Sequence, residues 1–147
     1  MMEVATYMRQ RNLLDFLPNY SYFGTETGEI KENSYLLYPI RMIERLREFY
    51  VFKGIGKIQE FLRSNEDLIP ILYEALGHIY RIFGPNVINF LELHSDPEES
   101  WDELFIVIKS PYPSEKAREL MDRLGDEWFL NIIDKVGNRL CITEEPL

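Results

Sequence analysis

The chain has 147 residues, of which 46% are apolar, and it carries a formal net charge of −9. Nine Phe, nine Tyr and two Trp supply enough apolar surface for the core of one domain, which excludes disorder as the main state. Cys141 is the only cysteine, so an internal disulfide is excluded. No signal-peptide pattern and no apolar run of roughly 18 residues is present, so we expect a cytoplasmic protein that does not bind membranes.

We expect the first 56 residues to form a helical and extended N-terminal segment. A weak helical pattern ends at Pro18, because proline lacks the amide hydrogen that a helix needs. Aromatic residues around glycines over residues 20–38 indicate extended structure. Apolar residues at helical spacing then predict an amphipathic helix over about residues 40–52. We expect residues 57–147 to form an α+β core and both parts to make one compact domain.

The core begins with two helices and a hairpin. A short helix is expected over residues 57–63, followed by a longer one that Ser64 caps and that ends near Phe83. Residues 87–94 and 101–109 read as paired strands, because apolar and polar residues alternate in the second, with a six-residue polar link between them. In that second strand, one face carries the aliphatic residues Leu104, Ile106 and Ile108.

The remaining pattern is helix and strand. Ser114 is expected to cap a helix that Gly125 interrupts, and a further helical turn carries Trp128 before Gly137 ends it. The final strand is expected over residues 139–143. The order helix–strand–strand–helix–strand predicts an α+β fold with a small, mainly antiparallel sheet and helices on one face. A strand from residues 28–38 would complete a ferredoxin-like layer, and we expect the crossover connection to be right-handed.

Five short motifs stand out in the last two-thirds of the chain: Ile58 to Asn65, Phe83-Gly-Pro, Glu92-Leu-His-Ser-Asp-Pro-Glu, Asp102-Glu-Leu-Phe-Ile and Met121-Asp-Arg-Leu-Gly-Asp-Glu-Trp-Phe-Leu. Together they resemble the motifs of a family of small prokaryotic proteins with no assigned activity. The similarity extends over residues 57–145, about 60% of the chain. Phe129 and Gly125 depart from the family pattern, which has a second tryptophan and an acidic or polar residue there. The resemblance implies a fold and a bacterial or archaeal origin, but no chemistry.

The excess negative charge lies at the C-terminal end of the chain. Residues 91–147 contain six basic and fourteen acidic residues, a net charge of −8. Such a surface repels phosphate backbones and attracts basic proteins, so we expect no nucleic-acid partner. The contrary hypothesis, a nucleic-acid regulator, rests on Arg41, Arg45 and Arg47, which alternate with acidic residues.

No complete catalytic or metal-binding constellation is recognisable, and no cofactor is predicted. His94 and Asp96 share one face of a strand and could serve a metal or acid–base site, but no third ligand is fixed by spacing. The alternative hypothesis is therefore an enzyme or small-ligand protein with a site between helix and sheet, made by these two residues and the acids of residues 122–127.

The leading hypothesis is a non-enzymatic interaction module that binds a basic protein or a second copy of itself. Three observations support it: the one-sided charge, the aromatic content and the lack of a complete catalytic constellation. The aromatic N-terminal segment could dock a second copy or a partner, and exposed aromatic residues mark binding surfaces. For Trp128 and Phe129, a place in the core is the stronger interpretation of the pair. The candidate partner-binding residues are Glu98, Glu99, Trp101, Asp126, Glu127 and Trp128.

Overall fold

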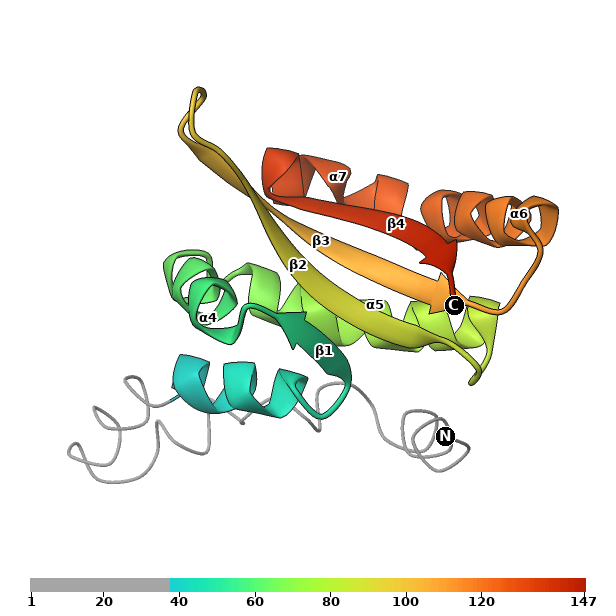
Figure 1. Ribbon diagram of the computed structural model, residues 1–147, viewed down its shortest axis with the longest axis horizontal. Coiled ribbons are helices and arrows are strands. Elements are labelled where there is room, and N and C mark those ends of the chain that lie inside the picture. Colours follow the sequence, from blue (N-terminus) through green and yellow to red (C-terminus); the bar gives the residue numbers. More distant parts are fainter. Residues whose placement is uncertain (1–37) are drawn as a thin grey trace.

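The computed structural model describes residues 38–147 (Figure 1). The helical pattern before Pro18 and the strand expected within residues 28–38 fall outside this range, except for Tyr38, which is helical. None of the helices in the described part of the chain is long and apolar enough to cross a membrane.

A four-stranded mixed sheet forms the centre of the fold, in the order β1-β2-β3-β4. The middle pair is antiparallel, whereas both outer pairs are parallel. The prediction of a mainly antiparallel sheet was therefore wrong: each outer strand is joined to its neighbour through helices, and such crossovers return the chain in the same direction. The strands are β1 (Tyr50–Lys53), β2 (Ile88–Asp96), β3 (Trp101–Ser110) and β4 (Leu140–Pro146).

The predicted helix over residues 40–52 ends early. Residues 38–46 are helical, residues 47–49 form a turn, and β1 follows. Tyr50 is buried and its hydroxyl donates to the carbonyl oxygen of Leu72 at 2.7 Å, while Val51 is exposed. This alternation suits a strand, and Gly54, with φ of +84°, turns the chain into the next helix.

Helices fill both connections between parallel strands. Ser64 does not cap the second helix but is the last residue of the first, and the second starts after Asp67. Pro70 then lies in the first turn, where its missing amide hydrogen is harmless. Similarly, Ser114 is the first helical residue and Pro113 precedes it. The elements are α4 (Ile55–Ser64) and α5 (Leu68–Phe83), then α6 (Ser114–Leu124), a π-helix (Gly125–Phe129) and α7 (Leu130–Val136).

Helices from both connections pack on the same face of the sheet, as predicted (Figure 1). The aliphatic face of β3 and Leu91 of β2 join their core. The two connections advance in one direction across the sheet, but β1 and β2 run opposite to β3 and β4. Because the helices of both connections lie on one face of the sheet, one crossover connection is right-handed and the other is left-handed. One of them is therefore an exception to the expected right-handed crossover.

Candidate functional site

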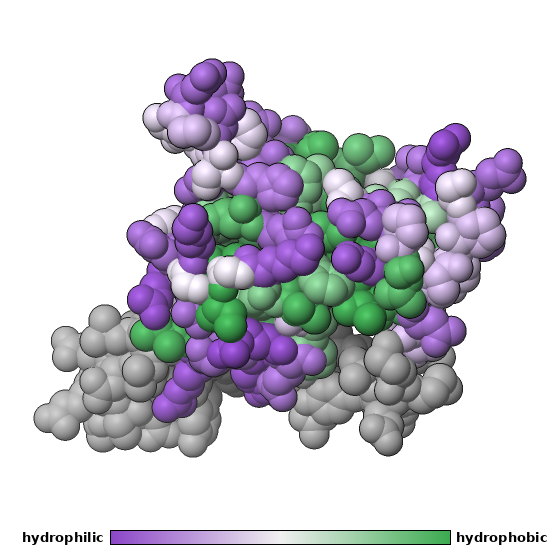
Figure 2. All heavy atoms as spheres, viewed as in Figure 1, coloured by the Kyte–Doolittle hydropathy of each residue, from purple (hydrophilic) through white to green (hydrophobic). Residues whose placement is uncertain are grey.

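The β2–β3 hairpin projects beyond the helix layer and forms what we call the hairpin arm, residues 94–103 (Figure 1). Strand pairing continues along the arm to Asp96 and Trp101, so four residues, not six, make the loop. Figure 2 shows the projecting end as a hydrophilic surface. The arm therefore presents two paired strands to solvent.

A hydrogen-bonded turn closes the arm. The Asp96 carboxylate accepts bonds from the backbone amides of Glu98 at 2.9 Å and Glu99 at 3.2 Å. The amide of Ser100 donates to the Asp96 carbonyl oxygen at 2.9 Å, and Ser100 adopts a left-handed φ of 55°. Aspartate favours such turns because its short side chain bonds the backbone two residues further on. These bonds fix the direction of the following residue, Trp101.

The arm carries five carboxylates, and none of them forms an ion pair within residues 38–147. Trp101 is 40% exposed, and its indole N–H donates to the Glu99 carboxylate. An exposed aromatic ring thus lies among negative charges that have no cationic partner in the part of the chain that the structure describes. Three of the predicted binding residues, Glu98, Glu99 and Trp101, come together here. The carboxylates are those of Asp96, Glu98, Glu99, Asp102 and Glu103.

The other three predicted binding residues, Asp126, Glu127 and Trp128, lie in the π-helix of the helix layer, away from the arm tip (Figure 1). Trp128 is only 3% exposed and belongs to the core, so it is not placed to contact a partner. The Glu127 carboxylate accepts bonds from Arg81 and Arg123, which hold its pKa below the usual range. Asp126 is exposed.

The π-helix places Trp128 in a polar cluster that the sequence analysis missed. Its indole N–H donates to Glu74 at 3.1 Å, and its ring stacks on His78 with centroids 4.9 Å apart. Arg81 lies 3.0 Å from Nδ1 of His78. Burial first, and then the Arg81 charge, lowers the pKa of His78, so the imidazole is neutral at pH 7. π-Helical turns are frequent at functional sites, but every group in this cluster already has an internal partner.

His94 and Asp96 share a face of β2, as expected, but this is the face opposite the helices. His94 stacks on Phe105 with centroids 4.2 Å apart and lies 3.4 Å from Glu92. The hypothesised site between helix and sheet therefore cannot include either residue, nor bring them to the acids of residues 122–127. Within residues 38–147, no three His, Cys, Asp or Glu side chains are grouped to hold a metal ion.

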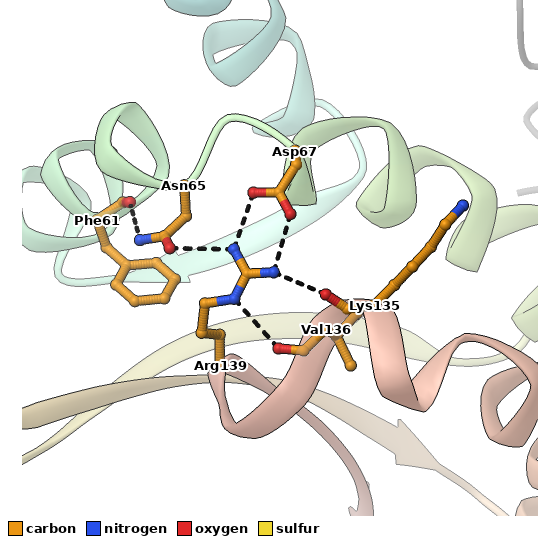
Figure 3. Close-up of polar contacts among 6 residues, drawn as sticks. All are labelled: Phe61, Asn65, Asp67, Lys135, Val136 and Arg139. Atoms are coloured by element: carbon orange, nitrogen blue, oxygen red, sulfur yellow. Dashed lines mark hydrogen bonds and ion pairs between the residues drawn. The ribbon is translucent and has the colours of Figure 1, made fainter.

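Arg139 joins the two connections from the side of α7 (Figure 3). It bonds both Asp67 carboxylate oxygens at 2.8 Å and the Asn65 side-chain oxygen at 3.2 Å. It also donates to the carbonyl oxygens of Lys135 and Val136. These contacts use all five guanidinium N–H groups, so none remains for a ligand. The bond from Arg139 lowers the pKa of Asp67. We conclude that Arg139 is a structural clamp.

Comparison of the chain with protein-family models, curated proteins and solved structures found no match.

Proposed function

We propose that this protein is an interaction module that binds a basic protein partner through the hairpin arm. The observation that supports this proposal is the projecting arm itself, where an exposed indole ring lies among carboxylates with no cationic partner in the described part of the chain. A second copy of this chain is the less favoured partner, because the net charge of −9 makes two copies repel each other.

The two features of the arm serve different steps of binding. Residues 94–103 contain five acidic residues and no lysine or arginine. At physiological ionic strength their field extends about 8 Å, far enough to accelerate the encounter with a basic surface. Trp101 supplies the apolar contact, since tryptophan is enriched among the residues that carry most binding energy. We therefore expect the acids to govern the association rate and Trp101 to govern the dissociation rate.

The test is affinity capture from host lysate with three forms of the full chain. The first is the wild type, and the second is the arm variant Glu98→Gln/Glu99→Gln. The third is Asp122→Asn/Asp134→Asn, which removes the same charge from exposed positions of the helix layer. We expect one basic protein to be captured by the wild type and by the helix-layer variant at low salt, and lost from the arm variant.

The captured protein is then purified and its binding rates are measured by biolayer interferometry. The arm variant should reduce the association rate by about tenfold at low salt, with a smaller difference at high salt. Trp101→Ala should mainly increase the dissociation rate. Equal binding by all variants would show that the partner docks elsewhere, and a loss that is equal in both charge variants would show that only total charge matters.

A further inference from the structure

Along the hairpin arm, the outer edge of β2 has no strand beside it in the described part of the chain. Pairing with β1 ends at Glu92, whereas pairing with β3 continues to Asp96. After β1, the left-handed backbone of Gly54 turns the chain into α4, so the arm extends beyond β1 (Figure 1). Residues 94–96 are therefore paired with a strand on one side only. Such an edge presents N–H and C=O groups that an extended peptide can bond.

A polar groove of about 500 Å³ lies between α4 and the arm. Leu93, Ser95 and Asp102 line it from the helix-facing side of the arm. Glu60 and Ser64 are among the residues of α4 that line it. Successive side chains of a strand point to opposite faces of its sheet. A strand added at the free edge of β2 therefore directs every second side chain toward this groove.

The charges of the groove and of the arm favour a basic peptide. Arg139 also lines the groove, but its guanidinium group is paired with Asp67. The other charged residues of the groove are Lys57, Glu60 and Asp102, with a net charge of −1, and none of them forms an ion pair within the described chain. The arm itself has five acidic residues and no lysine or arginine. Basic side chains of an added strand thus meet carboxylates on the arm and in the groove.

We propose that an extended basic segment of the partner protein adds to the sheet beside residues 94–96, as a strand that continues the line of β1. This inference rests on the proposed function, because it assigns a mode of binding to the same arm. Backbone hydrogen bonds to β2 supply affinity, and the groove selects basic side chains at alternate positions of the segment.

The first test titrates the full chain with a capped peptide of alternating lysine and valine, followed by NMR. The matched control peptide is methylated on its backbone nitrogens, which keeps the charge and the side chains but removes the backbone donors. We expect the unmodified peptide to slow hydrogen exchange within residues 94–96 and to bind about tenfold more tightly than the control, the effect of one or two backbone hydrogen bonds. Equal affinities, or no binding by the unmodified peptide, would overturn the added strand.

Capture from lysate separates this inference from the proposed function. Ser64→Trp fills the groove from α4, whereas Ser114→Trp places the same side chain at an exposed position outside it. We expect the wild type and Ser114→Trp to capture the partner and Ser64→Trp to lose it. Capture by Ser64→Trp, with loss from Glu98→Gln/Glu99→Gln, would overturn the added strand and leave the proposed function intact. If the wild type captures no protein, the proposed function fails, and the peptide titration still decides whether the edge accepts a strand.

Discussion

Replacement of Arg139 by lysine should destabilise the protein by about 1–2 kcal/mol. Lysine keeps the charge but cannot reproduce the planar fork that bonds both oxygens of Asp67. The ion pair alone contributes less than about 1 kcal/mol, because the Asp67 side chain is 60% exposed and solvent screens it. The bonds to Asn65 and to the last carbonyl groups of α7 add about 0.5–1 kcal/mol.

The assay is urea denaturation followed by circular dichroism at pH 7. The matched control is Arg47→Lys, because Arg47 makes one exposed 3.3 Å contact with Glu44 and its replacement should cost less than about 0.5 kcal/mol. If Arg139→Lys were as stable as the control, the clamp would contribute nothing beyond a surface ion pair, and the reasoning would be refuted.

The pH dependence of the same clamp follows from Asp67. Its folded-state pKa is lowered, first by the hydrogen bond from Arg139, below the unfolded value of about 3.9. The stabilisation is therefore fully present above that unfolded value and is lost as the pH falls through the folded pKa. The stability difference between wild type and Asp67→Asn should accordingly be constant from pH 5 to 7 and shrink below about pH 4.

Two further predictions concern side chains that the fold holds in unusual environments. Because the pKa of His78 is lowered by burial, the unfolded chain binds its proton more readily. Stability should therefore fall as the pH drops below about 6.5, and His78→Gln should reduce this loss between pH 6.5 and 5 in denaturation curves. Trp128→Ala should cost about 3–5 kcal/mol in the same assay, because it empties a core position.

Local patterns predicted the hairpin but not the sheet. Alternation along residues 101–109 is a property of the strand itself, so the β2–β3 pair could be read from sequence. The four residues of β1 follow a helix whose apolar spacing continues through Phe49 and Tyr50, so the helical period hid the strand. Parallel pairing of β1 with β2 depends on contacts between residues about 39 positions apart, which no local pattern reports.

The candidate sites show the same contrast between local features, which the sequence reveals, and contacts between distant residues, which it does not. Glu98, Glu99 and Trp101 are neighbours in the chain, so sequence alone could group them. The cluster around Trp128 joins it to Glu74, 54 residues away, and no spacing rule would have paired them. The sequence could therefore group the arm residues, which are local, but it could not predict the contacts that packing creates.

The effects of the charge and of the shape of the arm tip on partner binding can be measured separately. Asp96 contributes a carboxylate to the arm and also holds the amides of Glu98 and Glu99. Asp96→Asn removes the charge but retains an oxygen that can accept both bonds, whereas Asp96→Ala removes both. A tip that is already rigid loses less conformational entropy when the partner binds. If this matters, Asp96→Ala should bind the partner more weakly than Asp96→Asn. Faster hydrogen exchange at the two amides in Asp96→Ala alone would show that the turn has loosened. Equal affinities of the two variants, despite that loosening, would mean that the arm acts through its charge and not through its shape.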